Sequence, residues 1–329
     1  MGVVVITGAT AGLGKATALR FARAGFNVGI IARDDHSLAV AREEVARHGV
    51  KCHTVNADVA DAQAIMTAAQ EMEQHLGSID VWVNNAMCGV LAPFRAMEDD
   101  EFRRVTDVTY LGYVNGTRAA LAVMTPRDSG MIIQVGSAMA YRSIPLQSAY
   151  CGAKAAIRGF TDAVRTELIH ERINIHLAMV QLPGLNTPQF AWARNKFAFS
   201  MRPLGPVYEP EVAAEAIYNV VQRPVRELWV GRSTLQSIVG QFLFPGLLDR
   251  MMVKKAWEGQ MTNELNAPDR EDYLSGPVSG MHQVHGRFSS EANTRATAIT
   301  SGVPGKVLVG TVAVAAGLLA ARLFTGRKR

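Results

Sequence analysis

Tyr150 and Lys154 are four residues apart in a segment, 149–172, whose pattern predicts a helix, so their side chains share one face. The phenol of a free tyrosine has a pKa of about 10, and a nearby ammonium favours the phenolate and lowers that pKa. Ser137 follows a predicted strand at 131–135. Its hydroxyl could hydrogen-bond the substrate oxygen to which Tyr150 gives, or from which it takes, a proton. The three residues therefore suit proton transfer to or from a carbonyl or alcohol oxygen.

The same pair also fits a buried aromatic side chain beside a solvated lysine, because chance often produces this spacing. It is the only Tyr-x3-Lys pair in the chain. Ser143 and Ser148 compete with Ser137 and rank below it, since both lie in the segment between strand and helix.

A glycine-rich loop, TGATAGLGKA at residues 7–16, lies between an apolar run at 3–6 and a predicted helix at 15–24. In a doubly wound sheet, the first such loop holds a dinucleotide. Gly8 can adopt angles that a side chain forbids, whereas Gly12 and Gly14 would let the main chain approach the pyrophosphate at the helix N-terminus. An ordinary strand-to-helix turn is the alternative.

Short apolar runs and helical patterns alternate up to about residue 230, which predicts an α/β fold: a Rossmann-type doubly wound parallel sheet with helices on both faces, plus a C-terminal extension. The predicted strands are 3–6, 27–32, 52–55, 79–83, 131–135, 173–180 and 227–230. The predicted helices are 15–24, 38–48, 60–76, 98–124, 149–172 and 210–221.

Further motifs follow in order: NADV at 56–59, NNA at 84–86, VGSAMA around Ser137, YCGAK from Tyr150 to Lys154, and LPGLNT at 182–187. Together with the loop pattern TGxxxGxG, they resemble the classical short-chain dehydrogenase/reductase family over residues 3–230. The resemblance makes Ser137, Tyr150 and Lys154 the catalytic residues.

The resemblance also implies the cofactor contacts. Asp58, beside Val59, would contact the adenine, Asn85 would line the cofactor cleft, Lys154 would hold the nicotinamide ribose beside Tyr150, and Thr187, after Pro183, would meet the nicotinamide amide. Thr10 and Leu13 are expected to bind the cofactor with the loop glycines Gly8, Gly12 and Gly14.

Two positions depart from the family pattern. Met87 stands where the family usually has glycine, and Thr109 stands where a helix asparagine completes a proton relay. Asn115 lies further along the same helix, where we do not expect it to substitute. A threonine hydroxyl could still position a water, so we expect an altered relay.

Cofactor choice depends on the end of the second strand, where NAD-dependent enzymes place an acidic residue that binds the ribose hydroxyls. Here Ala32 is followed by Arg33, which suits a 2′-phosphate, and Lys15 adds positive charge after the loop. Asp34 keeps NAD as the less favoured alternative. We therefore expect NADP as the cofactor. We expect no metal ion, because His282 and His285 lack cysteine or carboxylate neighbours in the sequence.

Composition argues against several other classes. The 329 residues are 48% hydrophobic and 19% charged, with a net charge of +5 spread along the chain, so nucleic acid is not an expected partner. Three cysteines without a CxxC pair fit a reducing, cytoplasmic compartment, and the short first apolar run predicts no signal peptide.

Composition and pattern divide the whole chain into a catalytic domain, a linker and a C-terminal helix. Residues 1–258 form the expected catalytic domain, with a substrate loop and cap at about 185–258 that contains Phe190, Trp192, Phe197 and Phe199. These aromatic residues suit an apolar substrate or ordinary lid packing. The apolar segment 235–248 could cap the cleft, touch a membrane or form a subunit interface.

Residues 259–305 are rich in Gly, Pro, Ser and Asn and predict a flexible linker. Residues 306–329 predict an apolar helix, with few charges before the terminal basic cluster, which we interpret as a membrane anchor of marginal length. A buried or subunit-docking helix is the alternative. Truncation after about residue 259 is then expected to leave an active domain.

These observations predict an oxidoreductase that transfers a hydride between NADP(H) and a small, apolar ketone, aldehyde or secondary alcohol, as a homo-oligomer associated with a membrane through its C-terminal helix. The alternative is a membrane-tethered NADP(H)-binding sensor or scaffold with little catalysis, which Thr109 and the tail would favour.

Overall fold

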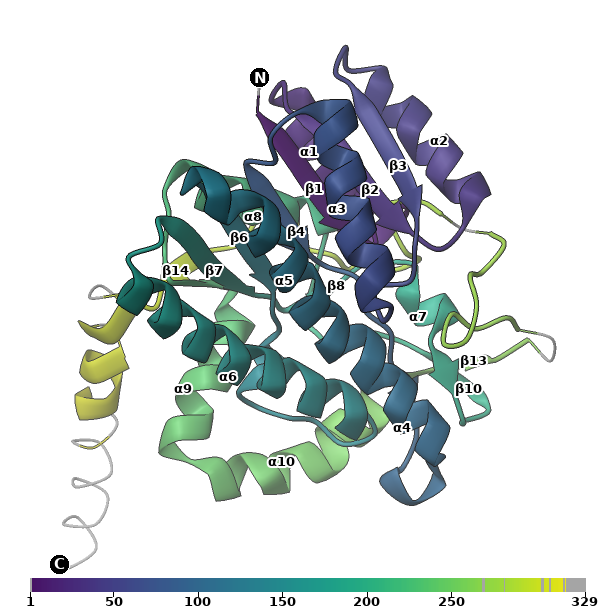
Figure 1. The fold of residues 1–329 in the computed structure, drawn as a ribbon. Coiled ribbons are helices and arrows are strands. Elements are labelled where there is room, and N and C mark those ends of the chain that lie inside the picture. The colour runs from purple at the N-terminus through teal and green to yellow at the C-terminus, as the bar shows by residue number, and fades with distance from the viewer. Residues whose placement is uncertain are drawn as a thin grey trace, which may run out of the picture.

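The computed structural model describes residues 2–267, 270–280, 282–302, 305–307, 309–315 and 317. Its centre is an eight-stranded sheet of order β14-β12-β7-β6-β4-β1-β2-β3 (Figure 1). All neighbouring strands pair in parallel except β14, which is antiparallel to β12. The strands are β1 (Val3–Thr7), β2 (Asn27–Ala32), β3 (Cys52–Asn56), β4 (Val81–Asn84), β6 (Gly130–Val135), β7 (Ile175–Gln181), β12 (Glu227–Val230) and β14 (Ala298–Thr300).

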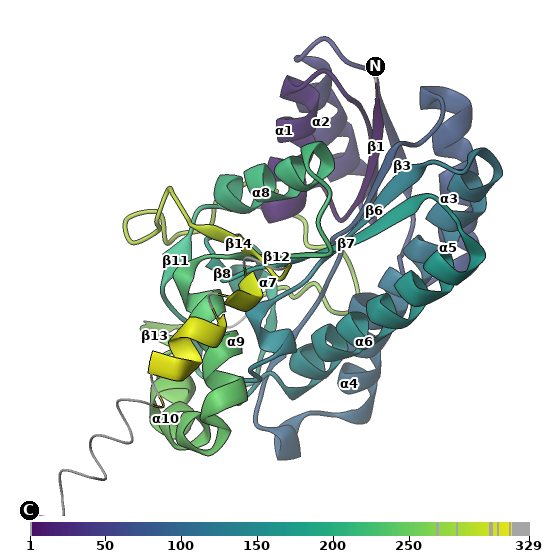
Figure 2. The same ribbon diagram turned by 90° about the vertical axis from the view of Figure 1, so that its left-hand side faces the viewer.

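Helices cover both faces of this sheet, as Figure 2 shows from its edge. One face carries α1 (Gly12–Arg23), α2 (Asp35–Ala46) and α8 (Pro210–Gln222); the other carries α3 (Ala62–Leu76), α5 (Gly112–Met124) and α6 (Ser148–Glu171), with α4 (Asp99–Thr106) at the end of that layer. The predicted doubly wound α/β fold is confirmed.

Alternate residues of a strand serve the two hydrophobic cores. In β1, Val3 and Val5 pack in the core under α3 and α5, whereas Val4 and Ile6 pack under α1 and α8. Because both faces are buried, the strand is a continuous apolar run rather than an alternating one.

The predicted helix at 98–124 is interrupted in the structure. Residues Asp107–Leu111 form a π-helical turn between α4 and α5, and such turns are frequent at functional sites. Periodicity alone does not reveal this wider turn, because the apolar residues on either side of it still face the sheet.

The region 183–258 forms the wall of a cavity. It contains short elements β8 (Gly184–Leu185), α7 (Gln189–Trp192), β9 (Arg194–Asn195), β10 (Phe199–Met201) and β11 (Val207–Tyr208), and the helices α9 (Arg232–Leu243) and α10 (Pro245–Glu258). Strands β5 (Val90–Leu91) and β13 (Met261–Leu265) pair with β9 and β10. Of the three roles considered for 235–248, the cap is favoured by Ser237 of α9, which lines the cavity.

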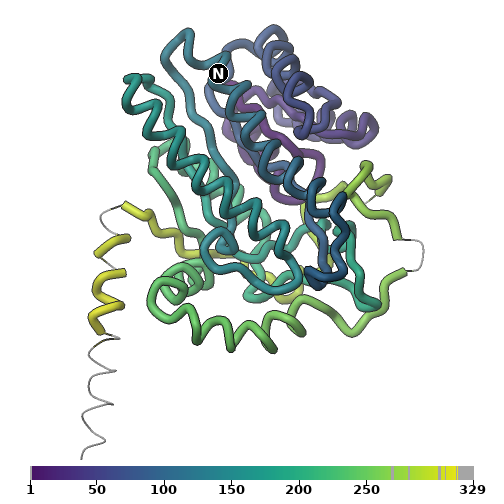
Figure 3. The backbone as a smooth tube through the Cα atoms, turned by 60° about the horizontal axis from the view of Figure 1, so that its bottom comes forward, coloured from purple at the N-terminus to yellow at the C-terminus, as the bar shows by residue number. Residues whose placement is uncertain are grey.

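Within the segment predicted as a flexible linker, 259–305, the described residues 259–267, 270–280 and 282–302 pack on the domain instead. The segment runs from α10 past the N-terminal half of the chain and returns to the sheet edge as β14 (Figures 1 and 3). Leu274 and Phe288 are buried, and Ile299 pairs with Trp229 of β12. Its apolar residues are isolated in the sequence and its contacts are largely main-chain hydrogen bonds, so composition gave no sign of this packing.

The predicted C-terminal helix is only partly described. Residues 305–307, 309–315 and 317 are helical, and residues 318–329 lie outside the described residues. In the described part of the chain, we find no helix with the length and apolar character needed to cross a bilayer.

This packing reverses the expectation for truncation. A chain ending at Gly259 should melt about 5 °C or more below a matched chain ending at Gly302, because removal of residues 260–302 exposes the apolar side chains that they cover. Each large side chain returned to water costs about 1.5–3 kcal/mol, and 1 kcal/mol shifts Tm by about 2–4 °C. Thermal denaturation followed by circular dichroism measures the melting temperatures of both chains. Equal melting temperatures would mean that residues 260–302 add nothing to stability.

Candidate active site

A cavity of about 360 Å³ lies at the carboxyl edge of the parallel strands. Every catalytic and cofactor residue predicted from the sequence lines it. These residues are Gly8, Thr10, Gly12, Leu13, Gly14, Arg33, Asp58, Val59, Asn85, Ser137, Tyr150, Lys154, Pro183 and Thr187. Open α/β sheets bind ligands at this edge.

The glycine loop forms a tight cradle at one end of the cavity. Gly8 and Gly12 have φ angles of +68° and +53°, and a Cβ on Gly14 would lie 2.1 Å from the Gly8 carbonyl oxygen. The amide of Asn85 donates to the carbonyls of Thr7 and Gly8, at 2.9 and 3.1 Å. The loop therefore has the backbone shape and close approach that a dinucleotide pyrophosphate requires.

Ser137 and Tyr150 meet at the other end of the cavity. Ser137 follows β6, and its hydroxyl accepts from the main-chain N–H of Met139 at 3.2 Å. Burial raises the pKa of Tyr150, and a hydrogen bond with Ser137 acts in the opposite direction. The Lys154 ammonium lies 5.6 Å from the centroid of the Tyr150 ring, and its lowering of the Tyr150 pKa stays a prediction.

Lys154 is almost fully buried beside them. Its ammonium donates to the main-chain carbonyl of Val135 at 2.7 Å and to the hydroxyl of Tyr113 at 3.0 Å, and burial lowers its pKa to about 7. Tyr113 was not among the predicted residues. It lies one helical turn after the altered position Thr109, and that position is the one feature of the sequence that points to it. An aromatic residue on a core helix otherwise gives no indication that its hydroxyl has a polar role.

Thr109 does not reach the cavity. Its hydroxyl donates to the carbonyl of Cys88 at 2.9 Å and accepts from the N–H of the same residue at 3.1 Å. Asn115 donates to the carbonyl of Val59 at 2.9 Å. Thr109 and Asn115 thus hold the main chain of neighbouring loops.

The end of the cavity at Arg33 and Asp58 is enclosed by residues 270–280 and 282–288, called the strap from here on. The Arg33 guanidinium donates to the carbonyls of Tyr273 and Gly276, at 2.6 and 3.2 Å, and lies 3.7 Å from Asp58. Arg104, a residue that sequence reasoning missed, pairs with Asp58 and donates to the carbonyl of Leu274 at 2.9 Å.

The strap also contacts the glycine loop. The N–H of Gly12 donates to the carbonyl of Gln283, and the Lys15 ammonium donates to the carbonyl of His282, both at 2.9 Å. Lys15 is buried and also pairs with Glu44 at 2.8 Å. It faces the strap and does not line the cavity.

Among the described residues that line the cavity, five polar atoms are buried without a hydrogen-bond partner: Nε of Arg142, Oγ1 of Thr187, Nε1 of Trp192, Oγ of Ser233 and Nδ1 of His282. Buried polar groups are normally paired. Together with the glycine cradle, these atoms fit a large polar ligand such as a nicotinamide dinucleotide, and the place of Thr187 suits the carboxamide.

The aromatic residues of the predicted substrate loop separate in the structure. Phe190 and Trp192 line the cavity, whereas Phe197 is half-buried and Phe199 is 44% exposed outside it. Cys88 and Cys151 are buried.

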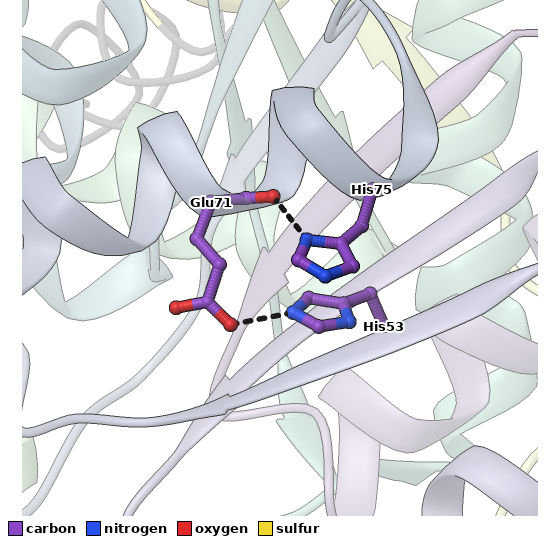
Figure 4. A group of neighbouring side chains, drawn as sticks. All are labelled: His53, Glu71 and His75. Carbon is purple, nitrogen blue, oxygen red and sulfur yellow. Dashed lines mark hydrogen bonds and ion pairs between the residues drawn. The ribbon is translucent and has the colours of Figure 1, made fainter.

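His53, Glu71 and His75 gather on the outer surface, between β3 and α3 (Figure 4). Nε2 of His53 lies 2.7 Å from the Glu71 carboxylate, and Nδ1 of His75 lies 3.0 Å from the Glu71 carbonyl oxygen. The two rings stack with centroids 4.0 Å apart and planes inclined by 11°. Imidazole lone pairs lie in the ring plane, so these parallel rings do not direct two nitrogens at one metal ion.

His282 and His285 have different partners in the structure, and His285, which we expected to lack carboxylate neighbours, lies beside Glu209 and Glu211. Nε2 of His282 lies 2.6 Å from the Val278 carbonyl oxygen. His285 faces away from it, with Nε2 2.9 Å from the Glu211 carboxylate. The two histidines therefore serve different contacts.

Comparison with known proteins agrees with this geometry. The model of the short chain dehydrogenase family matches residues 2–196. An uncharacterized oxidoreductase, YxnA, of Bacillus subtilis is 31% identical over 287 residues, which are 85% of this chain and 79% of that protein. A 3-dehydrosphinganine reductase of Danio rerio is 32% identical over 193 residues, 57% of this chain and 58% of that protein.

A solved structure supports the fold. The alcohol dehydrogenase of the archaeon Thermococcus sibiricus superposes with a TM-score of 0.58 at 24% identity, covering 70% of this chain and 95% of that one. The sheet, the glycine cradle and the family match agree, and the chain belongs to the short-chain dehydrogenase family.

Proposed function

We propose that this oxidoreductase transfers a hydride between NADP(H) and a ketone, an aldehyde or a secondary alcohol. The observation that carries the proposal is the placement of Ser137, Tyr150 and Lys154 on one cavity with the glycine cradle. The bound nicotinamide would supply or accept the hydride.

The chain's own residues would handle the proton and the substrate oxygen. Tyr150 would give a proton to the carbonyl oxygen during reduction and take it from the hydroxyl during oxidation. Ser137 would hold the same oxygen by a hydrogen bond. The Lys154 ammonium would favour the phenolate of Tyr150, against the burial that raises its pKa.

The preference for NADP over NAD rests on the end of β2. Arg33 and Asp34 both line the cavity, but the Asp34 carboxylate accepts from the N–H of Ser37 at the start of α2, at 2.7 Å. That hydrogen bond lowers the pKa of Asp34 and occupies the carboxylate that could otherwise bind ribose hydroxyls. A 2′-phosphate on Arg33 is therefore the better match.

The substrate part of the cavity is mainly apolar, with Phe190, Met201, Leu204 and Met252 among its lining residues. This supports a small apolar carbonyl compound or alcohol. The 3-dehydrosphinganine reductase named above acts, by its name, as a reductase, which agrees with the proposed reaction class. We propose that residues 1–258 carry the catalytic residues, with 185–258 as substrate loop and cap, and that the strap and β14 complete the same domain.

The first prediction concerns Tyr150. Tyr150→Phe should lower kcat/KM for ketone reduction by about 10²–10⁴-fold, because it removes the general acid, while Tyr218→Phe on α8, which lies outside the cavity, should leave the rate unchanged. The measurement is the absorbance of NADPH with a panel of ketones and aldehydes. An undiminished rate in Tyr150→Phe would overturn the assignment, and tight NADPH binding by an inactive wild type would favour the sensor or scaffold alternative.

The second prediction concerns cofactor preference. Arg33→Ala should weaken NADPH binding about 10- to 100-fold more than NADH binding, because a charge-assisted hydrogen bond is worth about 1.5–3 kcal/mol. Arg47→Ala, at an exposed position at the end of α2, is the matched control. Fluorescence titration gives both dissociation constants, and equal losses for the two cofactors would show that the NADP assignment is wrong.

A further inference from the structure

Lys154 carries a charge that the fold removes from water. The residue is 2% exposed. Among the residues that the structure describes, no carboxylate contributes to its lowered pKa, which follows from burial. An ammonium has three donors, and two of them are taken by the Val135 carbonyl and the Tyr113 hydroxyl. The charge is therefore stabilised by hydrogen bonds to neutral oxygens.

The titratable groups around this lysine are all neutral near pH 7. Tyr113 faces it from α5 and Tyr150 from α6, with ring centroids 4.6 and 5.6 Å from Nζ. Tyr273 from the strap, Cys88 and Cys151 lie next in the same cluster. Burial raises the pKa of every one of these phenols and thiols.

The orientation of the Tyr113 hydroxyl is set by a second hydrogen bond. Its single hydrogen is donated to the Val135 carbonyl at 3.0 Å, so its lone pairs remain for the Lys154 ammonium. Nζ, the phenol oxygen and the carbonyl oxygen thus form a closed triangle. Tyr113 is 1% exposed.

Thr109 does not perform this task. The resemblance places an asparagine of the proton relay at this position, but the Thr109 hydroxyl is fully used by the main chain of Cys88. Tyr113 lies one turn further along, after the π-helical turn, and has the reach to contact the lysine directly.

We propose that Tyr113 is a positioning residue that holds the Lys154 ammonium in place and keeps it charged, compensating for the missing relay asparagine. The proposal rests on the role of Lys154 in the function proposed above. Without the phenol oxygen, the ammonium loses one of its two protein acceptors, so its charged form is disfavoured. The lysine would then support the phenolate of Tyr150 less well.

The direct test measures the titration of Lys154. Lysine labelled with ¹³C at Cε is followed by NMR against pH in the wild type, and the Lys154 signal is assigned with Lys154→Arg. Tyr113→Phe should lower the midpoint of the Lys154 titration by about one pH unit. The matched control Tyr110→Phe, on the same helical segment and packed on Phe160, should keep the wild-type midpoint.

An unchanged or raised midpoint in Tyr113→Phe would overturn the proposal. If this variant does not fold, Tyr113→Met, which occupies part of the same volume without the oxygen, carries the same expectation. A purely structural role would lower the melting temperature and leave the midpoint of the folded fraction unchanged.

The second readout is the pH dependence of alcohol oxidation. In Tyr113→Phe, the rise of kcat/KM with pH should move to higher pH by about one unit, because Tyr150 loses support for its phenolate. A rise at the wild-type pH in an active variant would contradict the proposal. An inactive wild type would overturn the proposed function, while the NMR titration would still decide the role of Tyr113.

Discussion

Parallel pairing on both sides of β1 is the constraint on which the site depends. The chain passes from β1 to β2 and β3 on one side and continues from β4 to β6 and β7 on the other, so the loops after β1 and β4 diverge and leave a crevice between them. At the positions of Gly8 and Ala86 the two loops are still close to each other, since a Cβ on Gly8 would lie 2.9 Å from the Cα of Ala86. The glycine requirement follows from the topology.

Much of this arrangement was predictable because it depends on local signals. Buried strands such as β1 are continuous apolar runs, and the motifs at 7–16, 56–59 and 150–154 each follow a strand or begin a helix. Since parallel strands end at one edge, residues far apart in sequence had to meet there. The division of 98–124 by a π-helical turn was not predictable, because the periodicity on either side of it is helical.

The strap and β14 were not predictable for a different physical reason. Their attachment uses carbonyl oxygens of residues 273, 274, 276, 282 and 283 as acceptors for Arg33, Arg104, Lys15 and the glycine loop. Every residue has a carbonyl, so such contacts leave no trace in side-chain composition. Tyr113 was missed for another reason: it lies on a buried helix, where an aromatic residue is read as a packing residue and the role of its hydroxyl is not visible in the sequence.

The strap also determines which charges remain for a ligand at the end of the cavity that holds Arg33 and Asp58. Carbonyl oxygens satisfy the donors of Arg33 and Arg104 but do not cancel their charge, and both guanidiniums share the carboxylate of Asp58. One carboxylate against two guanidiniums leaves net positive charge in a half-buried region, where screening by water is weaker. Phosphate oxygens are stronger acceptors for guanidinium than neutral carbonyls. The same contacts that hold the strap in place therefore keep this end of the cavity suited to an anion.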